Sequence, residues 1–352
     1  MTSGLIPASA RSRESNMEAL RIVAMSMILI GHFFFHGFSS TLRMTPFHFV
    51  IAPLFIGGVN LFFLISGWFG IRFSLRSLVR LVAVVFCFIS LNMLALEIAG
   101  VSVSREQITD ALFFPVSRSR YWFIMVYMAM MILAPLLNAG LRAMGNRQLI
   151  SFVVLFSLFN MYGGSFGNNY VNGGGYTLTQ GIWMYCVAAC LRRNESRLAD
   201  IDRKWYLAGF ILFSMCSSVV LCLTEDWEWM DYNSPLVAAA AVSLFLYFTR
   251  LRFRSIAVNS LSAAAFGCYM LQDGLFGHTF LYKWMDNAYL GIIHSHAHAV
   301  AILLVLAMMV SLFVSFWGLS FLFTPVAGAI GARAGLLAAR LNSKLRLLFR
   351  HG

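Results

Sequence analysis

Repeated apolar stretches of about 20 residues constrain this fold most strongly, because a helix of that length spans the hydrocarbon core of a bilayer. Such stretches occur at 18–38, 48–71, 75–99, 120–140, 148–163, 176–191, 205–223, 234–249, 258–275 and 296–323. Composition agrees with this pattern, since 60% of the residues are hydrophobic and only 11% are charged, against about 25% charged in soluble domains. The sequence therefore predicts an all-α, polytopic membrane protein with about ten transmembrane helices.

The basic residues predict the orientation. Of the 26 Lys and Arg residues, only five fall in the loops on one side of these spans: Arg43, Arg105, Arg118, Arg120 and Lys283. Apart from Arg21, which lies inside the first span, the rest fall on the side that includes both termini. Because basic residues accumulate on cytoplasmic loops, we expect both termini in the cytoplasm. Attraction to an anionic leaflet accounts for the net charge of +12, so we expect no nucleic-acid partner.

One membrane domain is expected to fill most of the chain. Residues 1–17 are predicted to form a cytoplasmic N-terminal segment, and residues 18–325 the ten-helix transmembrane domain. Residues 326–352 interleave Arg and Lys with Leu. This pattern is typical of an amphipathic helix on the membrane surface, so we predict a basic cytoplasmic tail.

Two polar residues, Arg21 and His32, lie eleven positions apart in the first span. Residues turn by about 100° and rise by about 1.5 Å each along a helix, so these side chains share one face about 16 Å apart. A charge inside a span normally faces the protein interior or water and marks a functional pathway. Each residue alone also fits a structural role, as an Arg snorkelling to the interface or a His held by neighbouring helices.

The first two spans resemble those of a known family. The stretch Asn16–Arg21 (NMEALR), followed after ten residues by His32, resembles the first-helix pattern of the acyltransferase-3 superfamily. The stretch Gly58–Phe69 is similar to that family's Gly-x-x-hydrophobic-Phe-Phe-hydrophobic-x-Ser-Gly signature. Weaker similarities are Tyr121-Trp122-Phe123, Pro135 and Phe266–Leu271. Members of this family are integral-membrane enzymes that acylate extracytoplasmic carbohydrates.

The sequence departs from the family's pattern in two places. Many relatives carry two arginines three positions apart at the cytoplasmic end of the third helix, whereas Arg72, Arg76 and Arg80 are four apart. Where many relatives read Tyr-Leu-Ile-His in the ninth helix, this chain ends the same stretch with Gln272. The duty of that second His is expected to be absent or to be taken by Gln272 or Asp273.

The resemblance implies an O-acyltransferase in the cytoplasmic (inner) membrane of a bacterium. Its donor substrate would be cytoplasmic acetyl-CoA or another acyl-CoA, with acetyl as the expected group and no permanently bound cofactor. Its acceptor would be a hydroxyl of a cell-surface or exported polysaccharide or glycolipid. The implied partners are the lipid bilayer, acyl-CoA and a glycan or lipid-linked oligosaccharide, with other polysaccharide-assembly proteins as further candidates.

Candidate roles follow from side-chain chemistry. His32 is the candidate catalytic base, because imidazole titrates nearest to neutral pH among the side chains. Arg21 is the second candidate catalytic residue, because its planar guanidinium suits the phosphate oxygens of the donor. Arg76 and Arg80, at the same membrane face, are candidates for binding the donor. Candidates for binding the acceptor or supporting the site are His36, Asn60, Ser66, Glu97, Trp122, Tyr269, Gln272 and Asp273.

Some of these candidates carry specific expectations. Asn60 and Ser66 are expected to hydrogen-bond the first helix, since polar side chains join membrane helices. One of Asn92, Glu97, Tyr269, Gln272 and Asp273 is expected to orient His32. Two external segments could contact a sugar: the Gly/Asn-rich loop 163–175 and the acidic, aromatic stretch 224–232. We expect no metal site, because His294, His296 and His298 alternate at a strand spacing beside a helix start.

Two other classes of protein remain open. A transporter would also contain many spans with intramembrane charges, although the repeats and interrupted helices typical of transporters are not evident. A non-catalytic membrane component of polysaccharide assembly would leave Arg21 and His32 replaceable.

Overall fold

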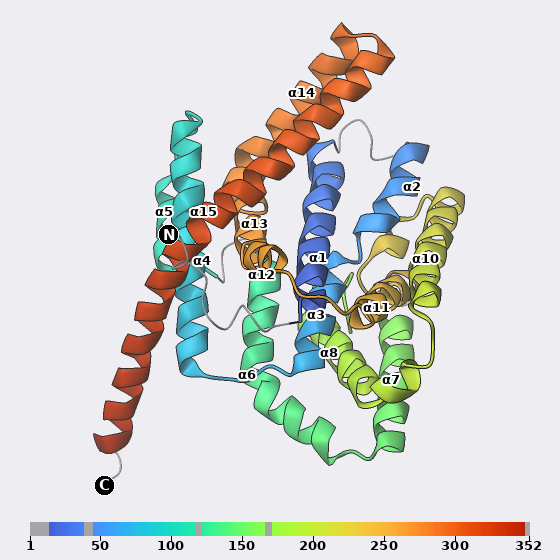
Figure 1. Ribbon diagram of the computed structural model, residues 1–352. Coiled ribbons are helices and arrows are strands. Elements are labelled where there is room, and N and C mark those ends of the chain that lie inside the picture. The colour runs from blue at the N-terminus through green and yellow to red at the C-terminus, as the bar shows by residue number, and fades with distance from the viewer. Residues whose placement is uncertain (1–13, 39–44, 117–120, 166–170, 349–352) are drawn as a thin grey trace. The chain divides into compact units, whose positions relative to one another are not determined.

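Every regular element in the described part of the chain is helical, which confirms the predicted all-α class (Figure 1). The computed structural model describes residues 14–38, 45–116, 121–165 and 171–348. Most of the predicted N-terminal segment 1–17 and residues 166–170 of the Gly/Asn-rich loop lie outside these ranges.

The chain forms two compact units, each built from two separate segments. Unit 1 comprises Met1–Gly70 and Leu136–Ala265, and unit 2 comprises Ile71–Pro135 and Phe266–Gly352. The border falls inside helix α6 (Trp122–Ala143), directly after Pro135. Proline lacks an amide hydrogen and interrupts helical hydrogen bonding. The border between the units therefore falls where the hydrogen bonding of α6 is interrupted.

Unit 1 contains twelve of the described helical elements besides the end of α6. They are α1 (Asn16–His32), η2 (Phe33–Gly37), α2 (Pro46–Phe55), α3 (Gly58–Phe69), α7 (Asn146–Asn160), η3 (Met161–Ser165), α8 (Leu178–Arg193), α9 (Glu195–Leu198), α10 (Arg203–Thr224), η4 (Trp227–Met230) and α11 (Pro235–Thr249), followed by the short α12 (Ile256–Ser262). The elements η2 and η3 are single π-helical turns.

Two glycines of the second-span signature let α3 approach its neighbours closely. A Cβ atom at Gly58 would lie 2.7 Å from the carbonyl oxygen of Ala24 on α1. A Cβ atom at Gly67 would overlap the backbone of Tyr185 on α8. Small residues permit such close approach between membrane helices. The signature therefore seats α3 against both α1 and α8.

Unit 2 contains α4 (Leu75–Ile98), α5 (Arg105–Phe113), the first part of α6, α13 (Ala265–Gln272), η5 (Gly277–Leu281), α14 (Tyr282–Ser295) and α15 (His298–Leu348). Helix α15 packs along α4 through Gly331 and Gly335. Cβ atoms there would lie 2.9 Å from the carbonyl oxygen of Arg80 and 2.6 Å from that of Arg76. Because the numbers rise along one helix as they fall along the other, α4 and α15 are antiparallel.

Seven helices in the described residues are long and apolar enough to cross a membrane. They occupy Asn16–Gly37, Phe47–Phe69, Leu75–Ile98, Trp122–Ala143, Arg203–Thr224, Trp227–Thr249 and His298–Ser343. The other three predicted spans correspond to α7, α8 and the α12–α13 segment, which are helical but shorter. The multi-pass character is therefore confirmed, whereas the count of ten and the cytoplasmic termini stay predictions.

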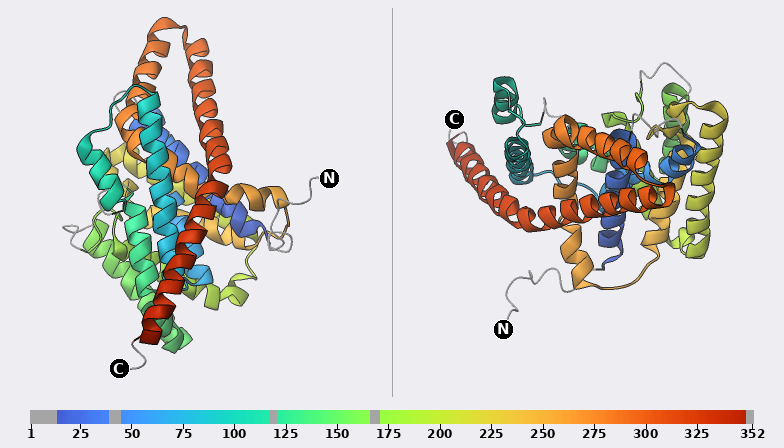
Figure 2. Two further views of the ribbon diagram at one scale, coloured as in Figure 1. Left: turned by 90° about the vertical axis from the view of Figure 1, so that its left-hand side faces the viewer. Right: turned by 90° about the horizontal axis from the view of Figure 1, so that it is seen from above.

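Helix α15 runs for 51 residues without a break (Figure 2). It passes through the predicted boundary between residues 325 and 326, so the structure joins the last predicted span to the basic tail as one helix. The sequence pattern did not predict this continuity, because the change from apolar to basic residues resembles the end of a span.

Candidate active site

Helix α1 carries both Arg21 and His32, as the sequence predicts. Its first turn is tied to the segment around α11 and α12 within unit 1. The Ser15 amide donates to the Phe253 carbonyl oxygen at 3.0 Å, and Asn16 Nδ2 donates to the Phe248 carbonyl oxygen at 3.1 Å. These bonds fix the start of α1, and with it the depth of each polar residue along the helix.

Arg21 is held in an ion pair with Glu18, one turn earlier on α1. Its Nη1 donates to the two Glu18 carboxylate oxygens at 2.6 and 2.7 Å. The Glu18 side chain is only 8% exposed, against 29% for Arg21. Glu18 Oε2 also accepts a hydrogen bond of 2.7 Å from Ser262 Oγ of α12. Within the described residues, Nη1 donates every hydrogen bond of the Arg21 side chain. The N–H groups of Nε and Nη2 can therefore donate to another group.

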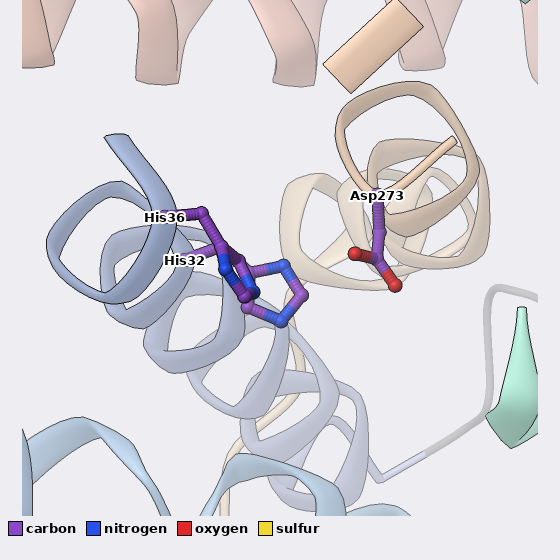
Figure 3. A group of neighbouring side chains, drawn as sticks. All are labelled: His32, His36 and Asp273. Atoms are coloured by element: carbon purple, nitrogen blue, oxygen red, sulfur yellow. The ribbon is translucent and has the colours of Figure 1, made fainter. Parts of the chain in front are cut away.

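His32 and His36 lie next to each other at the end of α1, with their rings tilted against each other (Figure 3). Their ring centroids lie 5.1 Å apart, with the planes inclined by 59°. His32 is half-buried and His36 is exposed. His36 lies on the π-helical turn η2, and turns of this kind are frequent at functional sites. The helical period predicts that the two residues are neighbours, but it does not predict the π turn.

Asn60 belongs to a buried polar network in unit 1. Its Nδ2 donates to the Tyr232 carbonyl oxygen at 2.8 Å, and its Oδ1 accepts from Gln180 Nε2 at 2.8 Å. Gln180 Oε1 in turn accepts from Asn172 Nδ2 at 2.7 Å. The predicted bonds from Asn60 and Ser66 to the first helix are wrong in the described structure. Asn60 instead binds this network, and Ser66 Oγ donates to the Phe62 carbonyl oxygen of its own helix at 2.8 Å.

The two segments that the sequence predicts to be external meet in unit 1. The Tyr232 amide donates to the Gly174 carbonyl oxygen at 3.2 Å, and the rings of Tyr176 and Tyr232 lie 5.0 Å apart. Gly174 and Gly175 have φ values of 62° and 79°, in the left-handed region that favours glycine. These glycines therefore form a tight turn. The buried network of Asn60, Gln180 and Asn172 lies next to this turn in the chain. No sequence pattern predicts that these segments pair.

Asp273 pairs with His278, a residue that sequence reasoning missed. His278 Nε2 lies 2.9 Å from Asp273 Oδ1, and the side chains are 20% and 8% exposed. Figure 3 places Asp273 at the end of the α13 region, and His278 follows on the π-helical turn η5. A carboxylate bound to an imidazole is an arrangement that orients histidines for proton transfer. Residues five apart lie about 140° apart around an α-helix, so the bend at residues 273–274 and the π turn that follows it bring these two together.

Gln272 is buried beside this pair. Its Oε1 accepts from the Tyr282 hydroxyl at 2.7 Å, and its carbonyl oxygen accepts from the same hydroxyl at 2.9 Å. Burial raises the pKa of the Tyr282 phenol well above its usual value, and the Asp273 charge adds to this effect. The phenol therefore stays a neutral donor that fixes Gln272.

Of the candidates for acceptor binding or support in unit 2, Tyr269 and Trp122 belong to an aromatic cluster and Glu97 is exposed. Tyr269 packs against Tyr121 and Phe123, with ring centroids 5.7 and 6.1 Å away, and Trp122 packs against Phe123 at 6.2 Å. Glu97 is exposed and accepts from the Val103 amide at 3.3 Å. The predicted orientation of His32 by a side chain from this unit stays a prediction.

Arg76 and Arg80 are exposed at the start of α4. Arg333 of α15 is also exposed and lies at the same level, because Gly331 and Gly335 on either side of it contact the Arg80 and Arg76 backbones. Arg333 is two residues from each of these glycines, so it lies on the side of α15 that faces away from α4. The contacts between α4 and α15 therefore do not bring Arg333 next to Arg76 and Arg80.

The described structure is that of a multi-pass helical membrane protein whose spans hold paired ionisable groups. A family model described as an acyltransferase domain matches residues 14–324. The chain therefore belongs to the acyltransferase-3 superfamily and is a membrane acyltransferase. No curated protein and no solved structure gives a match.

Proposed function

We propose that this protein transfers an acyl group, with acetyl expected, from a cytoplasmic acyl-CoA to a hydroxyl of a cell-surface or exported glycan. The observation that supports this most is helix α1, which holds Arg21 by an ion pair near its start and His32 at its end. Eleven residues separate the two groups by about 16 Å along the helix. This spacing suits a long donor entering from one membrane face and an acceptor approaching from the other.

Arg21 is the proposed contact for the donor. Glu18 binds the guanidinium of Arg21, and Ser262 donates a hydrogen bond to Glu18. The N–H groups of Nε and Nη2 suit phosphate or thioester oxygens. A planar guanidinium binds such oxygens in a fixed geometry. Arg76 and Arg80 are proposed as further phosphate contacts, because both are exposed at the end of α4 that we predict to be cytoplasmic.

His32 is the proposed general base. Its imidazole takes the proton of the sugar hydroxyl as that oxygen attacks the thioester carbonyl carbon. The carbon–sulfur bond then breaks, and the CoA thiolate takes the proton from the imidazolium, which leaves an ester and a free thiol. His36, exposed and 5.1 Å from His32 between ring centroids, is proposed to contact the acceptor. We place this reaction in the cytoplasmic membrane of a bacterium, with polysaccharide-assembly proteins as candidate partners.

The test replaces the proposed base. His32→Ala is expected to lower acylation by about 100-fold or more, since a general base contributes about 10²–10⁴-fold. The exposed His294→Ala is the matched control and should leave acylation unchanged. Mass spectrometry of surface polysaccharide, from cells with the gene, without it and with each variant, gives the ester content. Unchanged acylation in a well-expressed His32→Ala strain would contradict the mechanism.

A second measurement separates this function from transport. Purified protein should release free CoA from labelled acetyl-CoA in the presence of acceptor and without any solute gradient. A transporter would leave the thioester intact.

A further inference from the structure

The π-helical turn η2 presents His36 on one side and packs two phenylalanines on another. His36 is exposed, whereas Phe34 is buried and Phe35 is half-buried. Single π turns are rare, and relaxation of η2 to α-helical winding would rotate His36 about the helix axis. The position of His36 beside His32 (Figure 3) therefore depends on the side chains that hold these two phenylalanines.

The imidazole of His48 on α2 contacts both phenylalanines. Its ring centroid lies 6.1 Å from that of Phe34 and 5.5 Å from that of Phe35. The residue is fully buried. Its amide donates to Thr45 Oγ1 at 3.3 Å, a bond that caps the start of α2. Because burial and the helix cap both restrict its movement, His48 can act as a fixed support for η2.

Trp227 of η4 contacts the same rings. Its ring centroid lies 5.0 Å from that of His48 and 5.9 Å from that of Phe35, with the latter pair edge to face. In the described structure, both ring contacts of Phe35 are therefore to these two side chains. Aromatic pairs at such distances are more favourable than the burial of their surface alone would make them. The stretch 224–232 thus supplies a ring that packs against η2.

We propose that His48 is a positioning residue that, together with Trp227, holds η2 and so keeps His36 beside His32. This inference rests on the proposed function, in which His36 contacts the acceptor. All four residues belong to unit 1. The proposed donor contact, Arg21, lies about 16 Å from His32 along α1. A displaced η2 should therefore disturb the use of the acceptor and spare the binding of the donor.

The test measures acceptor and donor kinetics in a double-mutant cycle. Purified full-length protein transfers label from acetyl-CoA to surface polysaccharide, which is purified from cells that carry this gene and stripped of esters with mild alkali. The variants are His48→Ala, His36→Ala and both together. Phe49→Ala is the matched control, because Phe49 is the next residue on α2, is also buried, and contacts only Trp227 among the described rings, at 5.7 Å.

His48→Ala and His36→Ala are each expected to raise the KM for polysaccharide about three- to tenfold, as the loss of one hydrogen bond to the acceptor does. The KM for acetyl-CoA should not change. The double variant should match His36→Ala, because residues that act through one another are not additive. His48→Phe keeps a ring of similar shape, so it should stay within about twofold of the wild type. Phe49→Ala should lower the thermal midpoint and leave both KM values unchanged.

Phe35→Leu provides the test if His48→Ala does not fold, because it removes the half-buried ring that His48 and Trp227 contact. It should raise the polysaccharide KM and add nothing to His36→Ala. An unchanged polysaccharide KM in His48→Ala or Phe35→Leu would overturn the inference and leave the proposed function standing. Additive effects in the double variants, failure of His48→Phe to retain activity, or an equal change in Phe49→Ala would do the same.

Two further outcomes separate this inference from the function on which it rests. If His36→Ala leaves the polysaccharide KM unchanged, His36 does not contact the acceptor and the inference fails, whereas the general base is still tested by His32→Ala. If the wild type cannot acylate the polysaccharide, the proposed function fails, and this inference fails with it.

Discussion

A buried carboxylate one turn before Arg21 fixes that guanidinium. Glu18 is 8% exposed, and it accepts hydrogen bonds from both Arg21 and Ser262. Burial strengthens the ion pair, and it also makes loss of one partner costly, because the other charge is left uncompensated. Glu18 therefore acts on the site through Arg21 rather than by touching a substrate.

Glu18→Gln is expected to lower the free energy of unfolding by about 1–3 kcal/mol, less than for a fully buried pair because Arg21 is partly exposed. Acylation should fall about tenfold as Arg21 loses its fixed position. The control is Glu195→Gln, because Glu195 pairs with Arg192 at the same spacing and the same 2.6 Å distance on a more exposed surface. Glu195→Gln should lower the free energy of unfolding by less than about 1 kcal/mol. Thermal unfolding in detergent checks both values, and equal effects would contradict the argument.

Sequence reasoning at this scale succeeded where α-helical spacing was enough. Eleven residues placed Arg21 and His32 on one helix, and a spacing of three could also have predicted the Glu18 pair. It missed His278, because a spacing of five does not join two side chains on a regular α-helix, and the bend at residues 273–274 and the π turn after it are not visible in the sequence pattern. It also gave Asn60 and Ser66 the wrong partners, because the acceptors lie on residue 232 and on α3's own backbone.

At the element scale, close packing by glycine explains part of the second-span signature. Gly67 touches the backbone of Tyr185 on α8, whereas Gly140 on α6 has nothing within 4 Å of a Cβ position. Both lie inside helices, so the same substitution tests packing at one site and helix propensity at the other.

Gly67→Ala is expected to lower the thermal midpoint by several degrees, because α3 and α8 must move apart to admit the methyl group. Gly140→Ala should leave it unchanged or raise it, since Ala favours a helix over Gly by about 1 kcal/mol. Thermal unfolding of both variants in one detergent makes the comparison. A fall at Gly140 as large as that at Gly67 would mean that contact with α8 is not the cause.

Hydropathy predicted the long helices well. Each of the ten apolar stretches contains a helix, yet α7 and α8 have only 15 and 16 residues, so length does not establish that they cross the membrane. The short helices α5 and α14 were missed. Helix α5 mixes charged and apolar residues, and its signal is the Ser104–Gln107 capping box, which hydropathy ignores.

At the scale of the whole molecule, the grouping of helices into two units could not be predicted. Each unit joins chain segments that are distant in sequence, and α4 packs on α15 although more than 200 residues separate Arg80 from Gly331. Local periodicity shows which face of a helix is apolar, but not which helix covers it. The orientation across the membrane, in contrast, is set by charge on the loops and is open to prediction.

The predicted orientation places Ser102, before α5, outside and Ser196, on α9, in the cytoplasm; both are exposed. In a background with the six native cysteines replaced, Ser102→Cys should react with a membrane-impermeant maleimide in intact cells. Ser196→Cys should react only after permeabilisation, because Arg192, Arg193 and Arg197 hold that loop at the anionic inner leaflet. Each variant is the control for the other. The reverse pattern would invert the chain and remove the separation of donor and acceptor on which the proposed function depends.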